Sequence, residues 1–269
     1  MRTVAFGGVR VGVDTARPES PRVAACLAFA LRRIPAAPPG DVDVTLEASE
    51  EGDELVLRTP EGVFRERDPS AFVERIDHRL VYHLVDPCRA GLAVHAALVR
   101  TREGHGVVIP GESGAGKSTL ATSLLLAGHD VVTDELTLLG TEGPVHGFSR
   151  PLHLKPAGAG RFAGALAAFE TLSGSAGTFV HPPGDPPSPS ISAIVFPRRA
   201  DGEETVRRVP ASEAARRLLG TLINARNLDG HGVPLASAWA RRVPAFEIAW
   251  STAAFADASV SRCGAGVLP

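Results

Sequence analysis

Apolar and polar positions in the first third of the chain predict a mixture of strands and helices. Residues 4–13 are largely apolar and predict a strand, while residues 21–34 repeat apolar side chains at helical spacing behind a proline. Residues 41–67 alternate apolar and polar positions between glycine-containing turns, which predicts a small β-meander. Residues 68–86 predict an amphipathic helix that begins at the cap residue Asp68. Its apolar face consists of Phe72, Ile76, Leu80 and Leu84.

The pattern changes in the second part of the chain. Residues 91–110 predict a β-hairpin, followed by a glycine-rich turn and a helix that begins at Lys117 and ends at Gly128. Residues 129–139 predict the next strand, with an acidic pair in its middle. Alternating strands and helices of this kind are typical of an α/β core around a mixed sheet.

The remaining segments continue the same alternation. Strands are predicted at residues 148–156, 191–199 and 243–251, and a helix at residues 211–228. The glycine- and alanine-rich residues 156–178 predict a loose helix or a mobile cover. A short terminal helix ends the pattern.

We therefore expect two domains. Residues 1–88 form a small α+β N-terminal lobe without a chemical motif, and residues 89–269 form the domain that carries the chemistry. The boundary lies where the helical pattern of the lobe gives way to the hairpin.

Composition narrows the class of protein. The 269 residues are 44% hydrophobic and 22% charged, which is ordinary for a soluble globular protein. A formal net charge of -2 means that the chain lacks the excess of positive charge that is typical of nucleic-acid-binding proteins. No apolar run reaches the length of a membrane span, and the opening residues lack the apolar core of a signal peptide. Cys26, Cys88 and Cys263 show no metal spacing, so we expect reduced thiols in a cytoplasmic protein.

Residues 110–119, PGESGAGKST, fit the phosphate-loop pattern G-x-x-x-x-G-K-[ST]. In such loops glycines let successive backbone N–H groups point at phosphate oxygens, aided by the positive end of the following helix. Lys117 is expected to reach the β- and γ-phosphates of ATP, and the Ser118 hydroxyl to ligate Mg²⁺. The expected nucleotide cradle is Gly111, Glu112, Ser113, Gly114, Ala115, Gly116, Lys117, Ser118 and Thr119.

The number of lysines supports this role. The chain has 28 lysines and arginines, and only Lys117 and Lys155 are lysines. A lysine kept in so arginine-rich a chain indicates a position that needs a compact ammonium.

The acidic pair Asp134-Glu135 follows Lys117 by 17 residues, enough for one helix and a return strand. Two carboxylates beside a phosphate site can divide two tasks, because one can hold Mg²⁺ while the other accepts a proton from an attacking hydroxyl. The plainer alternative is a solvated acidic pair at a strand end. His95, in the apolar strand that enters the site, is on its own more typical of a buried structural histidine.

Residues 94–141 resemble the catalytic core of the HPr kinase/phosphorylase family. The shared order is a strand with V-H-A, a hairpin, the phosphate loop, a helix ending in G-H, and an acidic pair, and RPLHLKP extends the likeness to about residue 156. The resemblance implies a fold related to phosphoenolpyruvate carboxykinase and the phosphorylation of serine on a protein. It also implies Asp134 as general base, and Glu135 with Ser118 as Mg²⁺ ligands. Under the same resemblance His95 lies near the phosphates, and Arg150 and Lys155 contact phosphate or acceptor.

The sequence also departs from that family. Glu135 stands where the family has a second aspartate, and Thr119 stands where the bacterial regulator has a glutamate. The regulator's glycine-rich EIRGLGI signature has no match here. Shorter relatives include kinases that phosphorylate a serine of a precursor peptide, as in some lasso-peptide pathways, and the sequence looks like that group.

The sequence therefore predicts an ATP- and Mg²⁺-dependent kinase that phosphorylates a hydroxyl, with a serine of a peptide or small protein as the favoured acceptor. Two alternatives stay open. One is a kinase of a small-molecule hydroxyl, although such kinases usually begin close to the loop. The other is a weakly catalytic ATP-binding sensor or assembly module. A homo-oligomer is compatible with all three.

Overall fold

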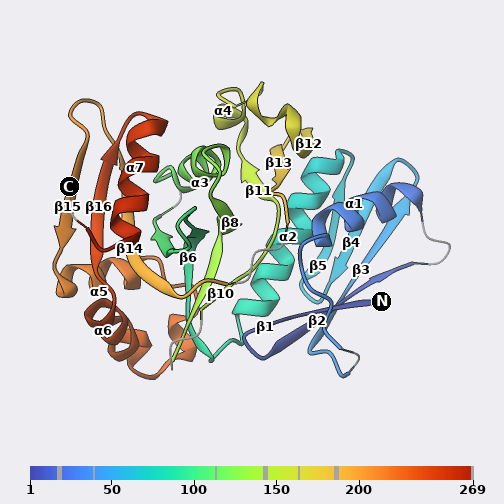
Figure 1. Ribbon diagram of the computed structural model, residues 1–269. Helices are drawn as coiled ribbons and strands as arrows, with labels where there is room; N and C mark the ends of the chain where they lie inside the picture. The colour runs from blue at the N-terminus through green and yellow to red at the C-terminus, as the bar shows by residue number, and fades with distance from the viewer. Residues whose placement is uncertain are drawn as a thin grey trace. The chain divides into compact units, whose positions relative to one another are not determined.

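The computed structural model describes residues 1–16, 20–38, 40–112, 114–141, 145–162, 164–184 and 188–267, without the side chains of residues 145 and 146 (Figure 1). Contacts divide the chain into two compact units. Unit 1 contains Met1–Cys88 and Ser149–His181, and unit 2 contains Arg89–Phe148 and Pro182–Pro269. The division at residue 88 is where the sequence suggested a boundary. Residues 149–181, however, group with the N-terminal lobe and interrupt the predicted domain 89–269.

The first part of unit 1 is a five-stranded sheet with two helices. Its strands, in spatial order, are β1 (Arg2–Phe6), β2 (Val9–Thr15), β3 (Val44–Glu51), β4 (Glu54–Thr59) and β5 (Gly62–Glu66). The single strand predicted at residues 4–13 is in fact two strands, because Gly7 and Gly8 both take positive φ and turn the chain.

Both predicted helices of this unit are present, namely α1 (Pro21–Leu31) and α2 (Pro69–Val85). Asp68 caps α2, since its carboxylate accepts a hydrogen bond from the Ala71 backbone N–H at 3.0 Å. The predicted apolar face of α2 is buried throughout.

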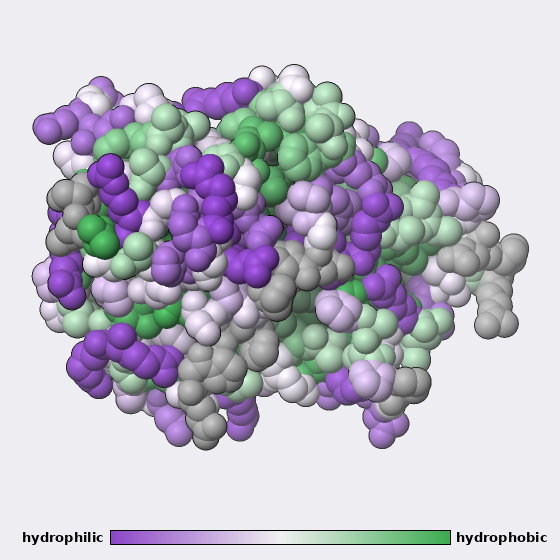
Figure 2. Space-filling model, viewed as in Figure 1, coloured by the Kyte–Doolittle hydropathy of each residue, from purple (hydrophilic) through white to green (hydrophobic). Residues whose placement is uncertain are grey.

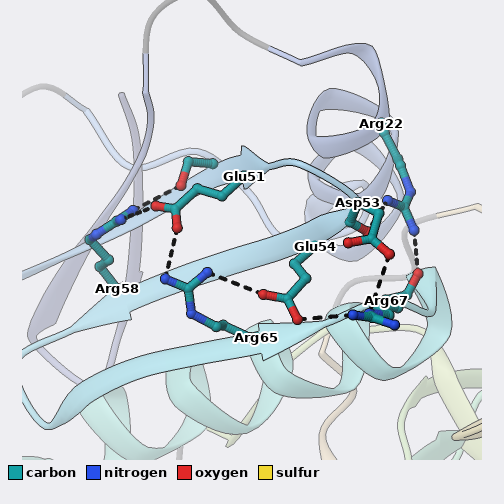
Figure 3. Close-up of polar contacts among 8 residues, drawn as sticks. Arg22, Glu51, Asp53, Glu54, Arg58, Arg65 and Arg67 are labelled. Carbon is teal, nitrogen blue, oxygen red and sulfur yellow. Dashed lines mark hydrogen bonds and ion pairs between the residues drawn. The ribbon is translucent and has the colours of Figure 1, made fainter.

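Charged side chains form a ladder across β3, β4 and β5 and the residues directly beside these strands (Figure 3). Along the ladder, arginines and carboxylates alternate: Arg58, Glu51, Arg65, Glu54, Arg67 and Asp53. Exposed pairs of this type each stabilise a fold by only about 0–1 kcal/mol. The ladder therefore keeps the sheet surface polar rather than holding the unit together.

Residues 149–181 add a second, three-stranded sheet to unit 1. The strand order is β11 (Leu152–Leu154), β13 (Gly177–His181) and β12 (Glu170–Gly174). Two short helices, α4 (Pro156–Ala159) and η1 (Ala165–Ala168), precede β12, so the predicted loose helix is replaced by two helical turns and a hairpin. The segment joins α1 and α2 through polar contacts: Arg150 pairs with Asp77, and His181 Nε2 donates to the Phe29 carbonyl at 2.8 Å.

Unit 2 is built on an eight-stranded mixed sheet. The order is β10 (Val145–Gly147), β9 (Leu136–Gly140), β6 (Gly91–Arg100), β7 (Gly106–Pro110), β14 (Ile191–Arg199), β16 (Ala245–Trp250) and β15 (Thr205–Val209), with β8 (Asp130–Thr133) paired to β6. Strands β7, β14 and β16 run parallel, and the other pairs are antiparallel.

The helices of unit 2 cover this sheet (Figure 1). Helices α5 (Ala211–Gly220) and α6 (Val233–Arg242) contribute to a core with β14 side chains such as Ile194 and Phe196. Helices α3 (Lys117–Leu126) and α7 (Ala253–Gly264) pack on each other, and α7 also contacts β14 and β16. The short turns η2 (Ala225–Asn227) and η3 (Asp229–Gly232) connect α5 to α6. The predicted mixed α/β class is confirmed, whereas β15 and α6 were not predicted.

The surface seen in Figure 2 mixes hydrophilic and hydrophobic residues. Exposed large hydrophobic side chains of the described residues, such as Val63 and Ile223, are spread over different elements. Single exposed apolar residues are normal for folded proteins. No helix in the described ranges is long and apolar enough to cross a membrane.

Candidate functional site

The glycine loop, residues 111–116, connects β7 to α3 within unit 2. Gly114 and Gly116 have φ of 86° and 88°, in the left-handed region that favours glycine. Gly111 is crowded, because a Cβ there would lie 3.1 Å from Ala115 Cβ and 3.3 Å from Lys117 Cγ. Ser113, expected in the nucleotide cradle, lies outside the described residues. Strand, tight loop and helix follow one another as phosphate-binding loops require.

Lys117 begins α3, and its side chain turns back over the loop. The residue is only 5% exposed, and Nζ donates to the carbonyls of Gly111 at 2.6 Å and Glu112 at 3.0 Å. The Ala115 N–H donates to the Glu112 carbonyl at 3.1 Å and closes the turn. The ammonium is therefore held at the centre of the loop by main-chain oxygens. Ser118 and Thr119 follow it and are half-buried.

Strand β6 places the loop beside the acidic pair. The Gly111 N–H donates to the His95 carbonyl at 3.3 Å, and the Ala96 N–H donates to the Glu135 carbonyl at 3.1 Å. Ala96 is also the register partner of Pro110, the last residue of β7. The start of the loop and the acidic pair thus flank β6 on opposite sides, with about 10 Å between their backbones from two strand spacings.

The acidic pair does not lie in the middle of a strand, as the sequence predicted. Asp134 and Glu135 form a bend between β8 and β9. The ladder between β6 and β8 shifts register just before this bend, between Leu98 and Val99. Irregularities of this type change the direction of side chains and are frequent beside active sites. The bend releases both carboxylates from the regular in-and-out alternation of a strand.

The two carboxylates have different surroundings. Asp134 is fully buried, while the Glu135 side chain is 31% exposed. Glu135 Oε1 lies 3.3 Å from His95 Nε2, and its own N–H donates to Thr133 Oγ1 at 3.3 Å. His95 and Glu135 therefore meet at the partly exposed side of the acidic pair.

Arg150 and Lys155 lie in unit 1. Arg150 is 3% exposed and forms an ion pair with Asp77 of α2, so its expected contact with phosphate or acceptor disagrees with its burial. Burial lowers the pKa of Arg150 to about 9, and the charge of Glu74 acts in the opposite direction. A guanidinium consumed by a buried ion pair has little left to offer a ligand. Lys155 is exposed at the residue before α4.

Sequence reasoning missed the residues that fix His95. Strand β7 pairs with β6 only as far as Pro110, and the chain after α5 continues the pairing along the same edge of β6. There the His95 N–H donates to the Thr221 carbonyl at 2.8 Å. Buried Asn224 accepts from the Ala93 N–H at 3.0 Å and donates to the Gly91 carbonyl at 2.9 Å. A buried asparagine that forms hydrogen bonds with the backbone N–H and C=O groups of a strand in this way leaves no periodic signal in the sequence.

The residues present suit Mg²⁺ bound together with a nucleotide. The described residues contain no group of three or more His, Cys, Asp or Glu side chains that could hold a metal alone. Mg²⁺ bound with nucleotides uses one or two protein oxygens plus phosphate oxygens and waters. The Ser118 hydroxyl and the Glu135 carboxylate, both oxygen donors with some exposure, fit that requirement.

Unit 2 thus has a strand, a glycine loop with a central lysine, and a helix, beside a pair of carboxylates. Among curated proteins, the chain is 34% identical over 106 residues to HPr kinase/phosphorylase from Lachnoclostridium phytofermentans, covering 36% of this chain and 33% of the relative. It is 40% identical over 68 residues to putative HPr kinase/phosphorylase 2 from Oceanobacillus iheyensis, covering 25% of this chain and 21% of the relative. In the segments that match, the chain is therefore similar to HPr kinase/phosphorylases.

These similarities span about a third and a fifth of the relatives' own lengths. No family model matches the chain. Among solved structures, the HPr(Ser) kinase/phosphatase from Coxiella burnetii aligns with a TM-score of 0.30 and 14% identity, over 63% of this chain and 94% of that chain.

Proposed function

We propose that this chain is an ATP- and Mg²⁺-dependent kinase that transfers the γ-phosphoryl group to a hydroxyl. The observation that carries the proposal is the arrangement around β6. One side of this strand holds the glycine loop with Lys117, and the other holds Asp134 and Glu135. A cation for the phosphates and carboxylates for metal and proton are the parts that phosphoryl transfer requires.

Each residue has a distinct part in the proposed reaction. Lys117 exchanges its bonds to main-chain carbonyls for bonds to the β- and γ-phosphates and stabilises the charge that moves between them. Ser118 and Glu135 hold Mg²⁺, which neutralises phosphate charge when it is bound. Asp134 accepts the proton of the acceptor hydroxyl, and His95 orients Glu135 through the contact at 3.3 Å.

We further propose a serine of a peptide or small protein, such as a precursor peptide, as the acceptor. The curated relatives carry names that refer to the protein HPr, which supports a polypeptide acceptor as a class. The lack of the EIRGLGI signature argues against HPr itself.

One observation favours a second function, that of an ATP-binding module without transfer. Asp134 is fully buried, and a general base must come within hydrogen-bond reach of its proton. The kinase proposal therefore requires a neighbouring group to move when the acceptor binds.

The test is phosphate transfer with mass detection. The purified chain is incubated with ATP, Mg²⁺ and a pool of serine-containing peptides, and the peptides are analysed by intact mass. A gain of one phosphate that disappears in Lys117→Met supports the kinase. Binding of ATP without any gain of phosphate on peptides or small hydroxyl compounds supports the binding module instead.

A further inference from the structure

Three parallel strands of unit 2 end at the same edge of the sheet. Strand β7 ends at Pro110 and leads into the glycine loop, β14 ends at Arg199, and β16 ends at Trp250. In open α/β sheets, ligands bind outside the carboxyl ends of such strands. The ends of β14 and β16 are therefore placed to contribute residues to the site that binds the ligand of the loop.

Arg199 is held in place at this edge by Trp250. The two residues are register partners, so their side chains leave the sheet on the same face. The guanidinium carbon lies 4.4 Å from the centre of the Trp250 ring, which is only 2% exposed, whereas Arg199 is exposed. Stacking on a buried ring limits the freedom of the arginine and leaves the other face of the guanidinium open.

The same arginine lies against the glycine loop. Its Cγ and Cδ atoms are 3.7 Å from the position that a Cβ on Gly116 would occupy. Gly116 is the N-cap of α3, where backbone N–H groups and the helix dipole create positive potential. Lys117 is the next residue, so the side-chain stem of Arg199 lies beside the helix N-terminus from which the lysine extends.

Nothing in the described ranges neutralises Arg199 with an ion pair. The Glu204 carboxylate binds the residues that follow Trp250, because it accepts hydrogen bonds from the N–H groups of Ser251 at 2.7 Å and Thr252 at 2.6 Å. Like charges gathered in this way repel one another, and a polyanion bound between them removes that cost. The neighbouring Arg198 points to the opposite face of β14 by strand alternation and lacks these contacts.

We propose that Arg199, oriented by Trp250, is a second cation that binds the phosphates of the nucleotide at the glycine loop. The inference rests on the proposed function only in that the loop holds a nucleotide polyphosphate. It does not depend on phosphoryl transfer or on the identity of the acceptor.

The experiment measures binding of two probes, ATP and inorganic tripolyphosphate, by titration calorimetry. Arg199→Gln is compared with Arg199→Lys and with the matched control Arg198→Gln, after circular dichroism and thermal melting have shown that each variant is folded. Loss of one charge-assisted contact predicts that Arg199→Gln binds both probes about tenfold more weakly. Arg198→Gln should bind as the unaltered protein does, and Arg199→Lys should be intermediate.

Three outcomes overturn the proposal. Arg199→Gln could bind both probes as tightly as the unaltered protein. It could also lose affinity only for ATP and not for tripolyphosphate, which would show that Arg199 contacts the nucleoside rather than the phosphates. The unaltered protein could also bind neither probe. If the unaltered protein binds both probes but phosphorylates no acceptor, the proposed function fails. The comparison of the variants still tests whether Arg199 binds the phosphates.

Discussion

The ammonium of Lys117 donates to the carbonyl of Gly111 at 2.6 Å, so the lysine is held by the first residue of the loop that it completes. A second bond, to the Glu112 carbonyl at 3.0 Å, fixes it further. A compact ammonium can exchange these carbonyls for phosphate oxygens with little movement, since donor and loop are already in place.

Lys117→Met should therefore remove nucleotide-dependent turnover. We expect kcat/KM to fall by at least about a hundredfold, because a preorganised cation at the transferring phosphate is lost. The measurement is phosphate transfer from ATP under saturating Mg²⁺. Arg198→Gln, which removes a positive charge outside the loop, is the control and should keep full activity; a similar loss in both variants would contradict the assignment.

Asp134→Asn and Glu135→Gln should separate the two carboxylate roles. If Asp134 is the base, Asp134→Asn lowers transfer by about 10²–10⁴-fold while ATP and Mg²⁺ still bind. Glu135→Gln should instead raise the Mg²⁺ concentration needed for half-maximal activity, because one oxygen donor has lost its charge. Titrations of activity against Mg²⁺ distinguish these results. Intact transfer in Asp134→Asn would show that the buried carboxylate is not the base.

The sequence predicted the elements whose pattern is periodic or bears a motif. Helix α2 has one apolar face and a capping Asp68, and the loop has its glycines and Lys117; both are found where the pattern places them. Strand β12 could not be predicted, because almost all its side chains are exposed and no apolar alternation remains. The assignment of residues 149–181 to unit 1 depends on long-range contacts such as that between Arg150 and Asp77, which no local pattern reports.

The candidate site shows the same division. Local spacing identified Lys117 and the acidic pair, but the bend at Asp134 depends on register with β6. Arg199 and Trp250 are far apart in sequence and meet only because β14 and β16 pair in parallel. Residues brought together by sheet topology carry no signal in a single sequence.

Gly111→Ala should weaken nucleotide binding through crowding. Its new Cβ would meet Ala115 Cβ at 3.1 Å, so one side of the loop must move. We expect ATP affinity to fall by about tenfold, corresponding to about 1.4 kcal/mol. Adding Ala115→Gly removes the opposing atom and should restore part of the affinity. No recovery in the double variant would show that the loss has another cause.

Glu247 gives stability that depends on pH. Burial alone raises the pKa of this carboxyl, but hydrogen bonds from Arg207 and Arg217 more than offset that effect, and the pKa is lowered from 4.5. Because the pKa is lower in the folded protein, Glu247 stabilises the fold at pH values above its pKa in the unfolded chain. This stability is lost as the pH falls through the pKa of the folded protein. Glu247→Gln should reduce the free energy of unfolding by about 1–2 kcal/mol at pH 7, and by progressively less below pH 4.5.

Urea unfolding of both proteins between pH 7 and 3 measures that difference. The control is Glu203→Gln, since Glu203 is exposed and forms no ion pair within the described residues. A constant difference across this pH range would exclude the ion pairs of Glu247 as its source.

The three cysteines should resist alkylation in the folded protein. All three are buried thiols outside any disulfide, and burial raises the pKa of Cys26 to about 11 and that of Cys263 to about 12. Only about one Cys26 thiol in a thousand is then a thiolate at pH 8, and the thiolate is the reactive form. Iodoacetamide at pH 8, followed by intact mass, should modify the folded chain slowly and the chain in guanidinium rapidly at all three positions. Fast modification of the folded chain would show that local opening, rather than the native burial, governs access to these thiols.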